Sequence, residues 1–300
     1  MKILLLGGNG QVGYELQRSL APLGELTVTT RTGELPDGGA CETLDLYAPE
    51  TFTSLIDRAA PDIVVNATAH TAVDRAEDEP ELAFLANAEA PAELARLCAR
   101  RGSSLVHYST DYVFDGTANT PYREDNPTAP LGVYGASKLE GERRIQASGT
   151  EHLILRTAWV YATRGSNFLR TMLRVGADRD ELRVVADQRG CPTPAWLIAD
   201  VTAKILRTGL RQSGVRHLVA GGETTWHGFA EEIFREAHAR GLVSHSPRVI
   251  PIATSEYPTR ARRPAYSVLD THRLRSEYPI VLPDWRVALC STLNGPATTR

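Results

Sequence analysis

The sequence predicts an α/β fold with a doubly wound parallel sheet, and two observations carry this prediction. A short apolar run at residues 1–6 (MKILLL) runs directly into glycines and then into a helical pattern that includes Leu16 and Leu20. Through the first half of the chain, further short apolar runs alternate with helical patterns. Strands that alternate with helices form parallel sheets covered by helices on both faces.

The predicted elements follow one another along the chain in this order. Short apolar runs bounded by turn residues predict strands at residues 1–6, 26–30, 62–66, 104–109 and 153–155. Between them, helices are predicted at residues 49–59, 81–87 and 90–101, and around Tyr134. From about residue 160 onward, proline-rich loops separate helices at 167–175, 195–208 and 226–240, which predicts a smaller C-terminal lobe.

The first strand and helix are joined by three glycines. Gly7, Gly10 and Gly13 are spaced G-x-x-G-x-x-G. Glycines between a strand and a helix allow a tight turn, a close approach to phosphate and close packing of the helix on the strand. The loop therefore predicts a Rossmann-type domain that binds a dinucleotide at residues 1–160. Residues 161–300 would mainly form the substrate lobe, with some segments returning to the sheet.

The end of the second strand indicates which dinucleotide is preferred. An acidic residue there would bind the ribose hydroxyls of NAD, whereas a basic residue would accept the 2′-phosphate of NADP. This chain has Thr30 and Arg31 at that point, which favours NADPH, although NADH stays possible. Asp45 is a plausible contact for the adenine.

Tyr134 and Lys138 are the candidate catalytic pair. Four residues apart, they share one face of a predicted helix. An ammonium beside a phenol is expected to lower the phenol pKa, which suits proton donation to a carbonyl oxygen that is being reduced. Thr110 follows a strand end and would orient that carbonyl. Taken alone, the pair also fits a solvated helix face, and the threonine also fits a strand-end cap.

Together these motifs resemble the extended short-chain dehydrogenase/reductase superfamily and, more narrowly, the dTDP-4-dehydrorhamnose reductase family. The similar blocks are GQVGYELQ (10–17), AHTAVD (69–74), HYSTDYVF (107–114), RTAWVY (156–161), DQRGCPT (187–193), TTWH (224–227) and YPT (257–259). The resemblance implies that Gln11, Val12, Asp45, Leu46, Ala69, His70 and Thr71 line the dinucleotide. It also implies that Thr110, Tyr134 and Lys138 are catalytic, with Lys138 at the nicotinamide ribose, and that Thr110, Asp111 and Trp159 contact the sugar nucleotide.

The function implied by this resemblance is NADPH-dependent reduction of the C4 ketone of dTDP-4-dehydro-L-rhamnose. Two alternatives stay open: a 4-ketoreductase for another dTDP-deoxyhexose, and a non-catalytic NADP-binding sensor. Some family members bind Mg²⁺ through acidic side chains at a dimer interface. Glu15 matches one of these acids, but Trp196 occupies the position of another, and indole does not bind magnesium. We therefore expect no metal, and a monomer or a weak homodimer.

Composition argues against several other classes of protein, among them nucleic-acid-binding and membrane-spanning proteins. The net charge is −3, with acidic and basic residues interspersed, which argues against a nucleic-acid or anionic-membrane surface. No apolar segment is long enough to span a membrane. The four cysteines lie far apart in the sequence and are expected to be reduced thiols in a cytoplasmic protein. The tail at residues 295–300 is expected to be frayed.

Overall fold

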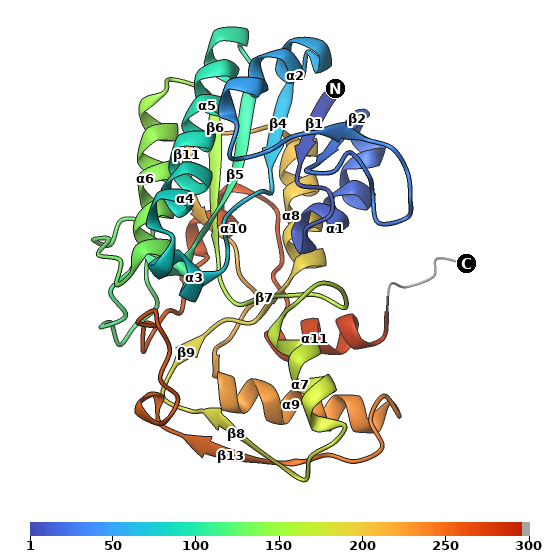
Figure 1. The fold of residues 1–300 in the computed structure, drawn as a ribbon, viewed down its shortest axis with the longest axis vertical. Helices are drawn as coiled ribbons and strands as arrows, with labels where there is room; N and C mark the ends of the chain where they lie inside the picture. Colours follow the sequence, from blue (N-terminus) through green and yellow to red (C-terminus); the bar gives the residue numbers. More distant parts are fainter. Residues whose placement is uncertain (296–300) are drawn as a thin grey trace.

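A seven-stranded parallel sheet forms the centre of the computed structural model, which describes residues 1–295 (Figure 1). Most of the tail predicted to be frayed therefore lies outside the described residues. The strands are β1 (Lys2–Leu6), β2 (Glu25–Thr30), β3 (Glu42–Thr43), β4 (Ile63–Asn66), β5 (Ser104–Thr110), β6 (His152–Thr157) and β11 (Gly214–His217). Their order is β11-β6-β5-β4-β1-β2-β3, with every neighbouring pair parallel. The predicted doubly wound sheet is confirmed.

Helices cover both faces of this sheet, and the side chains of β1 show why. Ile3 and Leu5 face a cluster that includes α1 (Gln11–Leu20) and α8 (Ala195–Thr208), while Leu4 and Leu6 face the opposite cluster. The helices of that second cluster are α2 (Phe52–Ala59), α5 (Ala90–Arg101) and α6 (Val133–Ala147). A strand with apolar residues on both sides is buried on both faces, so it reads as a continuous apolar run.

The two helices predicted at 81–87 and 90–101 form one continuous helical segment. α4 (Pro80–Phe84) passes through a π-helical turn (Leu85–Glu89) into α5. Asn87, in the π turn, is buried and bonds both backbone groups of His70 and the Ser137 hydroxyl. The widened turn thus holds the loop after β4 against α6. The helix predicted at 49–59 also differs, because its first turn (Pro49–Thr51) is 3₁₀ and α2 begins at Phe52.

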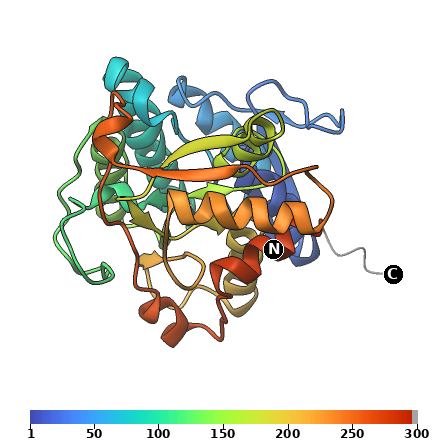
Figure 2. The ribbon, with the colours of Figure 1, turned by 90° about the horizontal axis from the view of Figure 1, so that it is seen from below.

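The second half of the chain builds a lobe at the carboxyl ends of the strands (Figures 1 and 2). Its parallel pair β8 (Glu181–Val185) and β13 (Arg248–Ile252) packs on α7 (Phe168–Gly176) and α9 (Trp226–Ala239). Short strands connect the lobe to the sheet: β7 (Val160–Tyr161) pairs with β10 (Thr193–Pro194), and β9 (Arg189–Gly190) pairs with β12 (Thr224–Thr225).

Other segments after residue 160 return to the sheet. β11 pairs with β6, α8 packs on α1, and α10 (His272–Glu277) lies beside β11. α11 (Trp285–Leu293) packs against α9. Among residues 1–295, no helix combines the length and the hydropathy that crossing a membrane requires.

Candidate active site

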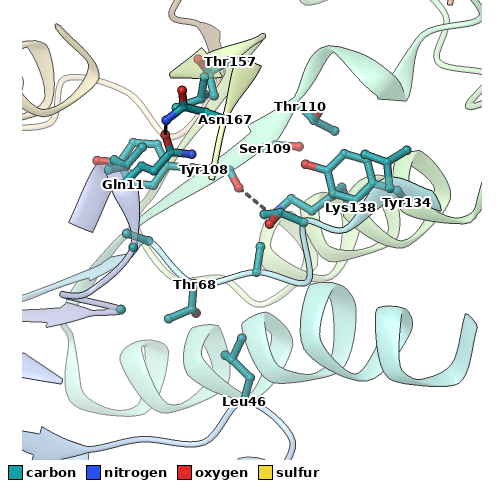
Figure 3. Close-up of a pocket in the computed structure, with 18 of the residues that line it drawn as sticks. Gln11, Leu46, Thr68, Tyr108, Ser109, Thr110, Tyr134, Lys138, Thr157 and Asn167 are labelled. Carbon is teal, nitrogen blue, oxygen red and sulfur yellow. Dashed lines mark hydrogen bonds between the residues drawn. The ribbon is translucent and has the colours of Figure 1, made fainter. Parts of the chain in front are cut away.

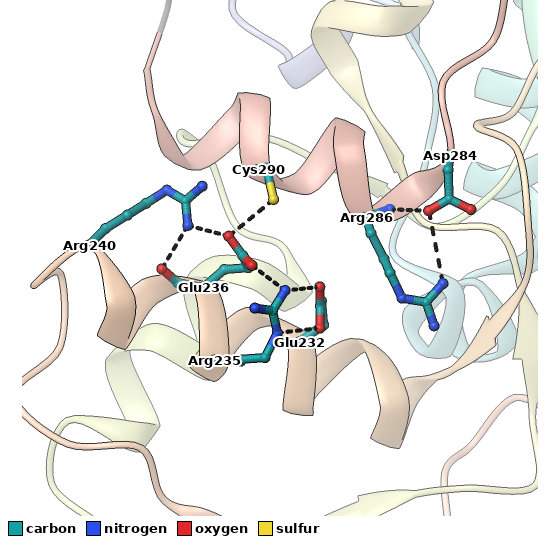
Figure 4. Close-up of polar contacts among 7 residues, drawn as sticks. All are labelled: Glu232, Arg235, Glu236, Arg240, Asp284, Arg286 and Cys290. Carbon is teal, nitrogen blue, oxygen red and sulfur yellow. Dashed lines mark hydrogen bonds and ion pairs between the residues drawn. The ribbon is translucent and has the colours of Figure 1, made fainter.

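A cavity of about 670 Å³ lies where the carboxyl ends of the strands meet the lobe. Fourteen of the site residues predicted from the sequence line it: Gly7, Gly10, Gln11, Val12, Arg31, Asp45, Leu46, Ala69, Thr71, Thr110, Asp111, Tyr134, Lys138 and Trp159. The glycine loop, the candidate catalytic side chains and the lobe therefore share one space (Figure 3).

The glycine loop leaves the first turn of α1 open to this cavity. Gly7 has φ +87°, a conformation that glycine adopts without strain. Gly10 is the N-cap of α1 and provides no side-chain hydrogen bond to the helix amides. A helix N-terminus whose amides have no side-chain cap is a suitable site for a pyrophosphate.

Two of the predicted cofactor contacts are absent from the cavity lining. Gly13 faces the loop itself, because a Cβ at this position would overlap the carbonyl oxygen of Gly7. Gly13 therefore allows close packing of helix on strand. His70 is buried beside α4, with its backbone N–H and carbonyl bonded to Asn87 and its ring 3.9 Å from Glu79. The Asn87 contacts hold the His70 backbone and turn its ring away from the cavity.

Arg31 is exposed at the cavity rim, directly after β2. The preceding Thr30 uses its hydroxyl within the loop, where it donates to the Glu34 carbonyl and accepts from the Gly33 amide. Asp45 accepts a hydrogen bond from the Tyr47 amide at 3.0 Å, which keeps this loop in a tight turn. The rim at this end of the cavity thus carries the exposed guanidinium of Arg31 beside loops that are held by these hydrogen bonds.

Thr110, Tyr134 and Lys138 lie close together in the wall of the cavity (Figure 3). Thr110 ends β5, and its hydroxyl donates to Asp111 Oδ1 at 3.1 Å. Tyr134 and Lys138 lie on the first two turns of α6. That helix approaches the strand end closely because Gly135 packs on the Tyr112 carbonyl oxygen, where a Cβ would overlap.

The proton affinities of the pair differ from the expectation based on sequence. Burial raises the pKa of the Tyr134 phenol to about 12, and its hydrogen bond with Thr110 only partly opposes this rise. Burial also lowers the pKa of Lys138 to about 8, against the effect of Glu142. The expectation that Lys138 would bring the phenol pKa below its usual value is wrong for this arrangement. The Lys138 amine instead donates to the Tyr108 carbonyl at 2.7 Å.

The lobe end of the cavity is aromatic. Trp159 stacks on Trp226 with ring centroids 3.5 Å apart and ring planes 5° apart. Trp159 has φ +45°, an uncommon conformation for a bulky residue, and Gly190 lies against its ring. Burial raises the pKa of the Asp111 carboxyl, which also lines the cavity, to about 6, and hydrogen bonds with Ser267 and Thr110 oppose this shift. An apolar ring surface beside a carboxyl group is suited to a sugar.

Several lining residues were not predicted from the sequence: Thr68, Tyr108, Thr157, Asn167 and Trp226. Asn167 caps α7 and also donates to Gln11 Oε1 at 2.8 Å, which joins the lobe to the glycine loop (Figure 3). Thr157 ends β6, so a search for polar residues at strand ends would have found it. Nothing in the sequence pattern brings Trp226 to Trp159.

Among residues 1–295, no group of three or more His, Cys, Asp or Glu side chains is placed to hold a metal ion. Glu15 lies near Arg18 and Asp200, and burial raises its pKa. The Trp196 indole donates to the Thr292 hydroxyl at 2.9 Å. The absence of a metal stays a prediction.

The sequence matches the family model described as the RmlD substrate binding domain over residues 1–297. It is 48% identical over 300 residues to a dTDP-4-dehydrorhamnose reductase of Burkholderia thailandensis, with 96% of this chain and 97% of that protein covered. It is 40% identical over 293 residues to a probable dTDP-4,6-dihydroxy-2-methyloxan-3-one 4-ketoreductase of Streptomyces antibioticus, with 96% of this chain and 93% of that protein covered.

Two crystal structures of dTDP-4-dehydrorhamnose reductases resemble the fold closely. The protein from Clostridium acetobutylicum has a TM-score of 0.88 at 36% identity. The protein from Bacillus anthracis, in complex with NADP, has a TM-score of 0.88 at 32% identity. Each comparison covers 98% of this chain and 99% of the other. The chain belongs to the dTDP-4-dehydrorhamnose reductase family.

Proposed function

We propose that the protein reduces the C4 ketone of dTDP-4-dehydro-L-rhamnose to dTDP-L-rhamnose, with NADPH as the reductant. The observation that carries this proposal is that Thr110, Tyr134 and Lys138 share one cavity with the glycine loop. NADP in the Bacillus anthracis structure and the exposed guanidinium of Arg31 at the rim favour the phosphorylated cofactor. The nicotinamide supplies the hydride when it is bound.

Each side chain then has a defined part. Thr110 orients the ketone oxygen, and Tyr134 gives its phenolic proton to the alkoxide that hydride addition creates, leaving tyrosinate. Lys138 holds the nicotinamide ribose and stabilises the tyrosinate until a proton from solvent restores the phenol. Asp111 and the stacked pair of Trp159 and Trp226 bind the sugar nucleotide from the lobe side.

A turnover assay tests the proposal directly. NADPH absorbance should fall with dTDP-4-dehydrorhamnose, and Tyr134→Phe should lower kcat by about 10²–10⁴-fold, the usual contribution of a general acid. NADPH binding to this variant, followed by fluorescence, should remain nearly unchanged. Normal turnover by the variant would remove Tyr134 from the mechanism, whereas binding without turnover by the wild type would indicate a sensor.

A second candidate is reduction of another dTDP-4-keto-deoxyhexose. The similarity to the Streptomyces antibioticus 4-ketoreductase favours it. A panel of dTDP-4-keto sugars, compared by kcat/KM, would distinguish the two substrates, because discrimination between sugars appears in that ratio. We further propose that the protein acts in the cytoplasm. We also propose that it is a monomer or a weak homodimer, and sedimentation over a range of protein concentrations would test its oligomeric state.

A further inference from the structure

A buried row of hydrogen bonds leads from the cavity wall to the back of Lys138. The Thr68 amide donates to Asn66 Oδ1 at 3.1 Å, and the Thr68 hydroxyl donates to the same oxygen. Asn66 Nδ2 lies 3.1 Å from His107 Nδ1, and His107 Nε2 lies 3.1 Å from Lys138 Nζ. Asn66, His107 and Lys138 are at most 1% exposed, so water does not compete for these contacts.

The direction of these bonds follows from their first member. A backbone amide can only donate, so the Asn66 atom that faces Thr68 must be the oxygen. The Asn66 nitrogen therefore faces His107 and donates to Nδ1. A neutral imidazole that accepts at Nδ1 carries its proton on Nε2. Burial and the nearby Lys138 hold the pKa of His107 well below its usual value, so the ring stays neutral.

The resulting Nε2–H points at the nitrogen of Lys138. A neutral amine can accept this hydrogen bond, but an ammonium has no lone pair with which to accept it. We propose that His107 is a positioning residue that weakens the proton affinity of Lys138, because Asn66 holds the imidazole in the tautomer that donates toward the amine. The inference rests on the proposed role of Lys138.

Other charged and titratable groups surround Lys138. On its own helix are Tyr134 and Glu142, and the Glu142 carboxylate raises the pKa of Lys138. From β5 comes Tyr108, whose phenol pairs with the Thr202 hydroxyl, and Asp111 follows that strand. From β6 comes Arg156, bound to Glu142. The π turn and β4 present the uncharged Asn87 and Asn66. His107 therefore opposes Glu142, the carboxylate one helical turn from Lys138.

The tautomer can be read in the wild-type protein by ¹⁵N NMR of labelled histidine. His107 should show a protonated Nε2 and an unprotonated Nδ1 at neutral pH. A protonated Nδ1 would overturn the inference. This measurement needs no turnover, so it stands even if every dTDP-keto sugar fails as a substrate, a result that would refute the proposed function alone.

Asn66→Asp tests the effect on Lys138. The carboxylate still accepts from Thr68 but now also accepts from His107 Nδ1–H, which turns Nε2 into an acceptor for the ammonium. A hydrogen bond to a charged group changes a pKa by about one to two units. The alkaline limb of kcat/KM should therefore move up by about one to two pH units, since Lys138 keeps its proton longer.

A double-mutant cycle separates this effect from the added charge. In a His107→Phe background, Asn66→Asp should move the limb by less than about 0.3 units, because coupled residues do not act additively. The same shift in both backgrounds would show a direct charge effect and overturn the inference. His152→Phe is the matched control, because it removes a buried imidazole of β6 that bonds the Thr150 carbonyl. If His107→Phe does not fold, ¹⁵N NMR of Asn66→Asp decides, because the inference requires the His107 proton to move from Nε2 to Nδ1 in that variant.

Discussion

Replacing Glu142 by glutamine should destabilise the protein strongly. Arg156 donates to both oxygens of this carboxylate, at 2.9 and 2.6 Å, and joins β6 to α6. The two side chains are 5% and 1% exposed, respectively. Glutamine keeps an oxygen acceptor but leaves a buried guanidinium without its counter-charge. Removing one partner of a buried ion pair costs about 3–5 kcal/mol.

Thermal unfolding gives the readout. A loss of about 1 kcal/mol of stability lowers Tm by about 2–4 °C in a chain of about 150–250 residues. On that scale, Glu142→Gln should lower Tm by about 6–20 °C. Glu42→Gln is the matched control, because Glu42 pairs with Arg58 at 2.9 Å with both side chains about half exposed. An exposed pair contributes at most about 1 kcal/mol. Similar losses of Tm in the two variants would refute the assignment of stability to the buried pair.

The same substitution should also change the pH profile. Glu142 lies one turn beyond Lys138 and raises its pKa, so glutamine at 142 should lower the proton affinity of Lys138 further. The alkaline limb of kcat/KM should then move to lower pH, opposite in sign to Asn66→Asp. The two pH profiles are measured at a temperature at which both proteins are folded. An alkaline limb that stays in place or moves to higher pH would contradict this reasoning.

Three further substitutions test the ends of the cavity. Arg31→Ala should raise KM for NADPH about tenfold or more and leave NADH unchanged, since a guanidinium–phosphate contact is lost; equal effects would exclude the 2′-phosphate role. Trp159→Ala should raise KM for the sugar nucleotide about tenfold, and an unchanged KM would place the sugar elsewhere. Gly13→Ala should cost about 1–3 kcal/mol in denaturant unfolding, because its methyl group overlaps the Gly7 carbonyl; unchanged stability would contradict that packing.

The fold could be predicted largely because its first strands are apolar on both faces. Residues 3–6 and 63–66 are all buried, so each strand is identified by a short continuous run of mostly apolar residues. β11 was missed because half of its residues are polar: Arg216 is fully buried and binds Glu277, and its neighbour His217 is buried as well. Such a strand has no apolar run in the sequence. Its polar side chains can be buried only because they find partners in the fold, as Arg216 does in Glu277.

The site could be predicted where chemistry is local in sequence and not where it depends on packing. Tyr134 and Lys138 are one helical turn apart, so their spacing was enough to bring them together. His70 belongs to a block that resembles the family, yet Asn87 holds its backbone and turns the ring away. Trp226 reaches Trp159 through the folding of the lobe, which no motif records.

The pKa values of Tyr134 and Lys138 also depend on packing and cannot be predicted from their spacing in the sequence. From the sequence, an ammonium four residues from a phenol predicts a phenol of lowered pKa. In the fold, both groups are buried, and burial disfavours the charged form of each, raising the pKa of Tyr134 and lowering that of Lys138. At neutral pH Tyr134 is therefore a neutral phenol, whereas Lys138, with its pKa of about 8, still carries its proton most of the time. A forming alkoxide, and the tyrosinate that proton transfer leaves, would both add negative charge near Lys138. Because the pKa of Lys138 lies close to neutral pH, this charge would hold the proton on Lys138 during the reaction.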